Sequence, residues 1–85
     1  MKLPRNLTGR QLAAALHKLG YVVVGQTGSH IKLRTERAGR KLLTVPDHAP
    51  LKTGTLSGIL RDVAKHHDLT RQAVMDMLFN PGAKS

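Results

Sequence analysis

The segment GSHIKLR, residues 28–34, places a histidine where it could carry out chemistry. An imidazole titrates near neutral pH, so His30 could transfer a proton, bind a metal, contact a ligand or pack in the core. Side chains alternate along a strand, and His30 is therefore expected on the face opposite Ile31 and Leu33. Because those two aliphatic residues belong in the core, the alternation disfavours a buried role for His30 and leaves proton transfer, ligand contact or a plain surface position open.

A second histidine, His48, lies in the loop segment PDHAP, residues 46–50. Two histidines can divide the roles of general acid and general base, which makes His48 a second candidate for proton transfer. The alternative is structural, with Asp47 and His48 fixing the turn into the next helix. The residues alone leave both roles open, and they leave open whether His48 reaches His30.

The charge of the chain points to a polyanionic partner, most simply a nucleic acid. Fourteen lysines and arginines against five acidic residues give a formal net charge of +9, and residues 1–41 carry nine of those cations with Glu36 as their single acid. A solvated basic surface or an acidic protein partner would show the same bias. Only Tyr21 and Phe79 are aromatic, so we expect RNA to be bound through phosphates, 2′-hydroxyls and shape.

Residues around His30 could contact an RNA backbone while the histidine takes the proton from an attacking 2′-hydroxyl. Gly28 and Ser29 allow close approach, and the Ser29 hydroxyl can donate a hydrogen bond to a phosphate oxygen. Cations follow across a predicted hairpin with Glu36 alone opposing them, which favours a binding role over a merely solvated turn. The candidate substrate-binding residues are Gly28, Ser29, Lys32, Arg34, Arg40 and Lys41, and Arg37 belongs to the same basic set.

The sequence has no arrangement typical of a metal site, a cofactor site or a membrane span. The chain has no cysteine, and its acidic residues are scattered. His66 and His67 are adjacent on a helix end, so their side chains diverge, and His17 lies on the polar side of another helix. We therefore expect no metal and no cofactor, and any ribonuclease chemistry is expected to be metal-independent. The N-terminus has no apolar signal region, which predicts a cytoplasmic protein.

Local patterns predict one helix followed by three strands. Thr8 and Gln11 form a capping-box pair, leucines recur with helical spacing, and Gly20 ends the helix. Three β-branched or alternating segments follow, joined by short glycine-containing connections that suit hairpins, and Pro46 is expected to end the third. The predicted strands span residues 21–26, 30–34 and 40–45.

A second helix is predicted after the loop at residues 46–54. Thr53 or Thr55 is expected to cap it, because a hydroxyl can accept a hydrogen bond from the first turn. Gly58 weakens this helix locally and is expected at a close packing contact. The apolar stripe of the helix consists of Leu56, Ile59, Leu60 and Val63.

A third, short helix is predicted over residues 71–78. Asp68 or Thr70 is expected to cap it, and the segment NPG at residues 80–82 is expected to end it. Its apolar face is expected to consist of Val74, Met77 and Leu78.

The order of elements predicts an α+β fold of the double-stranded-RNA-binding-domain type. In this α-β-β-β-α arrangement, helices cover one face of a three-stranded antiparallel sheet and bury both helical stripes. One domain is predicted over residues 1–85, with a core at about residues 8–66 and a C-terminal helical extension at residues 68–79.

Three segments together resemble the HicA toxin family, the small mRNA interferases of HicA–HicB toxin–antitoxin pairs. They are GSHIKLR, TVPDHAPLKTGTLSGILRDV at residues 44–63, and HDLTRQAVMDML at residues 67–78. The resemblance spans residues 8–79, and its specific feature is the succession of G-S-H, V-P-x-H and G-T-L-x-x-I-L-R. It implies a fold like that of double-stranded-RNA-binding domains, in agreement with the order of elements.

The resemblance also implies a function for the two histidines. The histidine of G-S-H is the catalytic residue of the family and matches His30, and the family often carries a histidine at the position of His48. The chain is thus expected to be the toxin of a type II toxin–antitoxin system, an endoribonuclease that cleaves mRNA. A HicB-like antitoxin is expected to bind over His30 and inhibit it. Many family members end soon after the second helix, so the helix at residues 68–79 departs from the pattern.

Two other functions stay open on the residues alone. A non-catalytic double-stranded-RNA-binding module would use His30 as one more polar residue facing the groove of the RNA. A helix-turn-helix bound to DNA would use the segment DLTRQAVMDML as its recognition helix. This helix offers only Arg71 as a cation and carries Asp76, which disfavours the DNA-binding interpretation.

Overall fold

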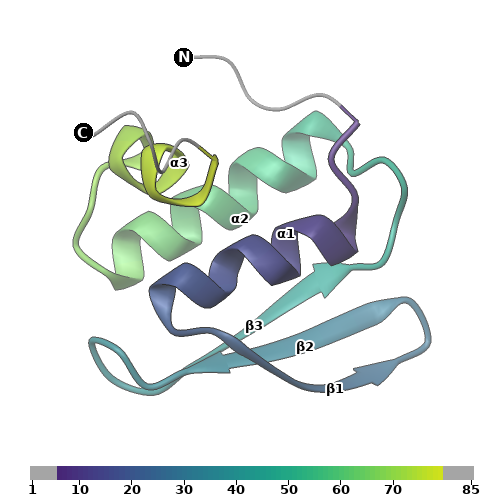
Figure 1. The fold of residues 1–85 in the computed structure, drawn as a ribbon, viewed down its shortest axis with the longest axis horizontal. Helices are drawn as coiled ribbons and strands as arrows, with labels where there is room; N and C mark the ends of the chain where they lie inside the picture. Colours follow the sequence, from purple (N-terminus) through teal and green to yellow (C-terminus); the bar gives the residue numbers. More distant parts are fainter. Residues whose placement is uncertain (1–5, 80–85) are drawn as a thin grey trace.

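A computed structural model describes residues 6–79, which form an antiparallel sheet covered by helices on one face (Figure 1). The sheet has the strand order β1-β2-β3. In Figure 1, α1 and α2 run side by side over the sheet, and α3 packs on them on the side away from the strands. This arrangement confirms the predicted α+β fold. The elements are α1 (Gly9–Leu16), the 3-10 helix η1 (His17–Leu19), β1 (Val22–Thr27), β2 (His30–Thr35), β3 (Lys41–Pro46), α2 (Thr53–His66) and α3 (Arg71–Phe79).

The register of the sheet places His30 at the end of the central strand. His30 pairs with Thr27 of β1 and with Pro46 of β3, both antiparallel. Between Val23 and Gly25 the register of β1 shifts, which marks a β-bulge. Pro46 is the last residue of β3, as the missing amide proton of proline predicts.

The helices and the inner face of the sheet share one core. Strict alternation along β2 buries Ile31 and Leu33 and leaves His30 and Lys32 exposed, which confirms the predicted faces of this strand. Burial of each large aliphatic side chain contributes roughly 1.5–3 kcal/mol, so this alternation holds the register strongly. The most deeply buried side chains are those of Tyr21, Leu12, Leu16, Leu33, Leu60, Val45, Val63, Val74 and Thr35.

Both predicted ends of the first helix are confirmed. Thr8 Oγ1 accepts a hydrogen bond from the Gln11 amide at 3.1 Å, and Gln11 Oε1 accepts one from the Thr8 amide at 3.0 Å. Gly20 follows η1 with a φ of +85°, in the left-handed region. A Cβ on Gly20 would lie 2.9 Å from the Arg37 side chain, which would have to shift, and the positive φ itself favours glycine at this position.

The start of α2 differs from the prediction. Its N-cap is Lys52, whose side chain makes no capping hydrogen bond, so the proposed caps Thr53 and Thr55 are wrong. The backbone of Lys52 is extended, with φ −69° and ψ 144°, and Thr53 is already helical. The expected close contact at Gly58 is also wrong, because no atom lies within 4 Å of the position where its Cβ would be.

The start of α3 agrees with one of its two predicted caps. The amide of Ala73 donates a hydrogen bond to Thr70 Oγ1 at 3.0 Å, which makes Thr70 the capping residue. Asp68 instead has a φ of +55° in the connection between the helices. The segment NPG at residues 80–82, predicted to end this helix, lies outside the described residues.

The buried face of α3 includes a different methionine from the one predicted. Met75 is buried with Val74 and Leu78, whereas Met77 is 38% exposed. The Lys18 ammonium donates a hydrogen bond to the Leu78 carbonyl at 3.0 Å, which ties the last turn of α3 to η1. The C-terminal helix is therefore packed into the same core as α1 and α2.

Candidate functional site

His30 is exposed at the first position of β2. Its backbone is held between β1 and β3 by pairing with Thr27 and Pro46. Within residues 6–79 its ring makes no hydrogen bond or ion pair. A histidine fixed through its backbone, with a ring that has no internal partner, is available to an external ligand.

The turn before His30 is open to solvent. Gly28 has a φ of +58°, which favours glycine, and no atom lies within 4 Å of where its Cβ would be. Ser29 is exposed beside it. The backbone of this turn can therefore be approached closely by a polyanion, as its composition predicts.

Three polar side chains, here called the Asp47 clamp (Arg10, Gln26 and Asp47), hold that turn. Asp47 Oδ2 accepts hydrogen bonds from Arg10 Nη2 at 3.1 Å and from Gln26 Nε2 at 3.0 Å. Gln26 Nε2 also donates to the Gly28 carbonyl at 3.0 Å. The Asp47 amide donates to the Ser29 carbonyl at 2.6 Å. The clamp thus ties α1, β1 and the loop after β3 to the two residues that precede His30.

His48 lies near the same turn but is not paired with His30. The residue follows Pro46, the β3 partner of His30, by two positions, and its side chain is exposed. Its carbonyl accepts a hydrogen bond from the Gly9 amide at 2.9 Å, which joins the loop to the start of α1. No hydrogen bond joins the two imidazoles in the described part of the chain.

The cations nearest His30 in the sheet lie on its outer face. Lys32 is exposed and Arg34 is partly exposed, at alternate positions of β2. Glu36 Oε2 lies 3.2 Å from Arg34 Nε and 3.4 Å from Arg40 Nε, so one carboxylate neutralises part of this set. Lys41 begins β3 and is exposed.

Arg37 has a structural role that the sequence did not predict. Its guanidinium donates to the Lys18 carbonyl at 3.2 Å, and its amide donates to Thr35 Oγ1 at 3.1 Å. The Thr35 hydroxyl in turn donates to the Leu19 carbonyl at 3.2 Å. Arg37 therefore anchors the turn between β2 and β3 to η1, unlike the other members of the basic set.

The two histidines at the end of α2 also have structural roles. His66 Nε2 lies 3.0 Å from both the Arg37 and the Gly39 carbonyl oxygens. His67 Nε2 lies 3.1 Å from the Tyr21 hydroxyl. Burial lowers the pKa of His67, and the nearby His66 and Arg37 lower it further. Burial also raises the pKa of the Tyr21 hydroxyl, which keeps both groups neutral near pH 7.

The open turn before His30 and the turn between β2 and β3, which carries the arginines at positions 37 and 40, lie at opposite ends of β2. Five residue steps separate His30 from Thr35, and at about 3.3 Å per step this is roughly 16 Å. One phosphate group cannot contact both ends. A nucleic-acid strand of several nucleotides could lie along β2, with one phosphate near His30 and others near Arg34, Arg40 and Lys41.

Neither a metal cluster nor a membrane-spanning helix is found in residues 6–79. No three histidine or acidic side chains there are grouped so that they could hold a metal ion. The helices of the same residues are too short and too polar to cross a membrane.

Comparison with known proteins identifies the family of the chain. The family described as HicA toxin of bacterial toxin-antitoxin matches residues 9–64. This match extends from the start of α1 through most of α2 and includes the open turn, His30, the clamp and His48. Comparison with curated proteins and with solved structures gives no match. The chain belongs to the HicA toxin family of bacterial toxin–antitoxin systems.

Proposed function

We propose that this chain is the toxin of a type II system and acts as an endoribonuclease on mRNA. The observation that carries the proposal is the exposed ring of His30 at an open glycine turn, on the same sheet face as Lys32 and Arg34. Membership of the family supports the toxin role. The resemblance of G-S-H to the catalytic motif of the family supports His30 as the catalytic residue.

In the proposed reaction, neutral His30 accepts the proton of an RNA 2′-hydroxyl. The 2′-oxygen attacks the adjacent phosphorus, and the bond to the 5′-oxygen breaks. The products are a 2′,3′-cyclic phosphate and a 5′-hydroxyl end. A protonated His48 is the candidate donor to the leaving oxygen, and Lys32, two positions along β2 on the same face as His30, stabilises the charge that develops on the phosphate. These side chains supply both proton transfers and the charge stabilisation, so the proposed reaction uses no metal and no cofactor.

The remaining candidates bind the substrate. Ser29 and the backbone of Gly28 approach the phosphate that reacts, because both are exposed beside His30. Arg34, Arg40 and Lys41 contact phosphates farther along the strand. With two aromatic residues in the chain, affinity comes from phosphates and shape, and it falls as the salt concentration rises.

The proposed partner is a HicB-like antitoxin in the cytoplasm. It inhibits the toxin by covering His30, whose ring has no partner within residues 6–79. A protein of net charge +9 suits an acidic partner surface.

Two linked experiments test this proposal. Expression of the wild type is expected to arrest bacterial growth, whereas His30→Ala is expected to be harmless at the same protein level. Purified wild type is expected to cut RNA in EDTA and to leave 2′,3′-cyclic phosphate ends. Cleavage that disappears in EDTA and returns with Mg²⁺ would contradict the metal-independent reaction. If the wild type binds RNA, cuts none and leaves growth unaffected, the chain is a non-catalytic RNA-binding module.

A further inference from the structure

The strand β1 is exposed along its whole length, unlike β2. Val22, Val23 and Val24 are 44%, 57% and 48% exposed, although valine is usually buried. The strand order leaves the outer edge of β1 without a partner strand in residues 6–79. An exposed, hydrophobic edge strand is a template for pairing with another chain.

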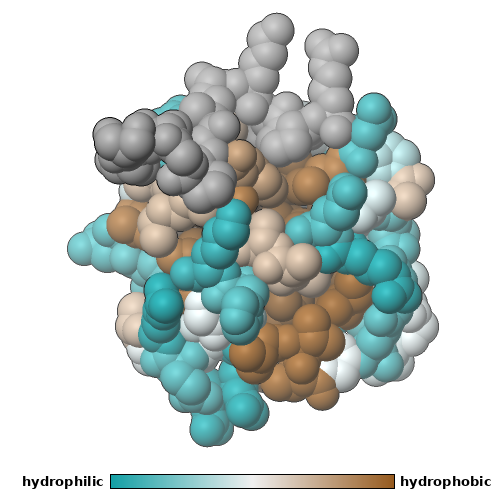
Figure 2. Space-filling view, viewed as in Figure 1, coloured by the Kyte–Doolittle hydropathy of each residue, from teal (hydrophilic) through white to brown (hydrophobic). Residues whose placement is uncertain are grey.

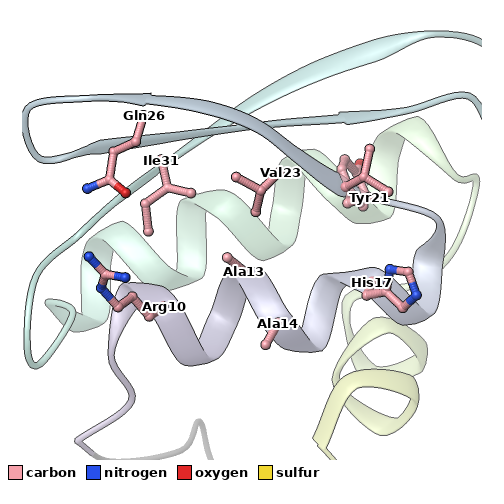
Figure 3. Close-up of a pocket in the computed structure, with 9 residues that line it drawn as sticks. Arg10, Ala13, Ala14, His17, Tyr21, Val23, Gln26 and Ile31 are labelled. Carbon is pink, nitrogen blue, oxygen red and sulfur yellow. The ribbon is translucent and has the colours of Figure 1, made fainter.

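A groove lies directly behind this edge, between β1 and α1. It is a cavity of about 400 Å³, and its lining is mainly apolar. Figure 3 shows Val23 and Ile31 pointing from the sheet toward α1, where Ala13 and Ala14 supply only methyl groups. In Figure 2, an apolar area bordered by hydrophilic side chains lies on the face that carries α1 and β1. The small alanines leave room that a larger residue would fill.

We propose that the β1 edge and this groove form the docking site for an extended strand of the antitoxin, one that alternates apolar and acidic residues. Pairing with β1 would satisfy the backbone groups of its free edge. Alternate apolar side chains of the partner would enter the groove, because side chains along a strand point to opposite faces. The inference rests on the proposed antitoxin partner and is independent of the ribonuclease chemistry.

Charge favours an acidic partner over a second copy of this chain. Arg10, whose side chain is 72% exposed, and His17 border the groove on α1. On the outer face, Lys32 and Arg34 pair with β1. A second copy would bring another net charge of +9 to this edge, whereas acidic residues of a partner strand would meet a basic surface in which Asp47 and Glu36 only partly offset Arg10 and Arg34.

The test is selection of short random peptides displayed on phage against the full-length protein. Peptides that alternate apolar and acidic residues are expected to be enriched, and the best one is synthesised for affinity measurements. Val23→Asp places a charge in the groove and is expected to weaken binding at least about tenfold. Leu42→Asp is the matched control, because Leu42 is 66% exposed on the opposite edge strand. The affinity of this variant for the peptide is expected to differ from that of the wild type by less than about twofold.

Folding of each variant is checked by circular dichroism and thermal unfolding. Ala14→Glu alters the other wall of the groove and is expected to weaken peptide binding as Val23→Asp does. If Val23→Asp fails to fold, Ala14→Glu replaces it in the test. RNA cleavage by the same variants is measured in parallel and is expected to be unchanged. Peptide binding without RNA cleavage would keep this inference and reject the proposed nuclease.

Three results would overturn the docking site. The first is a selection in which no peptide with alternating apolar and acidic residues is enriched. The second is an enriched peptide whose affinity is unaffected by both groove variants. The third is a dimer of the wild type, detected by analytical ultracentrifugation and abolished by Val23→Asp, which would assign the edge to a second copy of the chain.

Discussion

The two hairpin turns of the sheet are held by different means. The turn before His30 is held by the Asp47 clamp, whose arginine is largely exposed. The turn between β2 and β3 is held by the half-buried His66 and by the guanidinium of Arg37. One turn thus leaves its histidine ring without a partner in residues 6–79, and the other uses a histidine ring to fix its own backbone.

This contrast shows that residue type alone does not assign the role of a histidine here. His30 and His66 carry the same side chain, but His66 Nε2 faces two carbonyl oxygens and His30 has no partner within residues 6–79. We infer that substitutions at the His66 end change stability, whereas substitutions at the His30 end change cleavage. The variants below test this division.

His66→Ala is expected to have the largest effect on stability. It removes a donor shared by two carbonyls and the edge-to-face contact with His67, which together stabilise the fold by about 2 kcal/mol. Urea denaturation measures this loss, and the cleavage rate of the folded variant is expected to stay near that of the wild type. His17→Ala, at an exposed helix position, is the control. Equal stability of the two variants would contradict the structural role of His66.

Gly28→Ala and Gly39→Ala compare the two turns at matched positions. Both glycines have positive φ angles, +58° and +96°, with open space where a Cβ would be. Each substitution is expected to lower the free energy of unfolding by about 1 kcal/mol, because alanine disfavours the left-handed region. Only Gly28→Ala is expected to slow RNA cleavage as well. If both variants cleave equally slowly, the two ends of the sheet are not separate in function.

Asp47→Asn is expected to have a smaller effect, confined to cleavage. It removes the charge that accepts hydrogen bonds from Arg10 and Gln26 but keeps the shape of the clamp. Exposed ion pairs contribute less than about 1 kcal/mol, so we expect roughly threefold slower cleavage and little change in stability. Arg34→Ala is the comparison, since it is expected to weaken RNA binding instead. Faster cleavage by Asp47→Asn would show that the clamp does not position His30.

The pH dependence of stability is the smallest expected effect. Burial lowers the pKa of His67 below its usual 6.5, so the unfolded chain binds a proton more readily than the folded chain. His67 therefore leaves the free energy of unfolding unchanged at pH values above 6.5. It lowers the free energy of unfolding as the pH falls below 6.5. His67→Gln is expected to reduce the loss of stability between about pH 7 and pH 5, as measured by urea denaturation at each pH. An unchanged pH dependence in this variant would contradict the assignment.

The elements that the sequence predicted well are those with local signals. The capping box of Thr8 and Gln11 and the alternation of Ile31 and Leu33 involve residues close together in the chain, and both are confirmed. The correct methionine of α3 depends instead on contacts with α1 and α2. Met75 and Met77 are both apolar, and only tertiary packing decides which of them is buried.

The sequence predicted the exposed position of His30 but not the contacts that hold the turn before it. The exposed face of His30 follows from the alternation of β2. The clamp instead joins Asp47 to Gln26 and Arg10, which lie 21 and 37 positions earlier in the chain. No local pattern predicts such contacts. The valines of β1 likewise predict a strand, but only the order of strands shows that this strand is an edge.

Single-turnover cleavage of RNA by wild type and His30→Ala, at saturating protein and in EDTA, tests the central claim most directly. General acid–base catalysis contributes about 10²- to 10⁴-fold, so we expect a rate loss of that size in His30→Ala. The dissociation constant for RNA, measured in parallel, is expected to change less than about twofold, because the cations along β2 remain. Equal cleavage rates for the two proteins would contradict the account and make His48 the next residue to test.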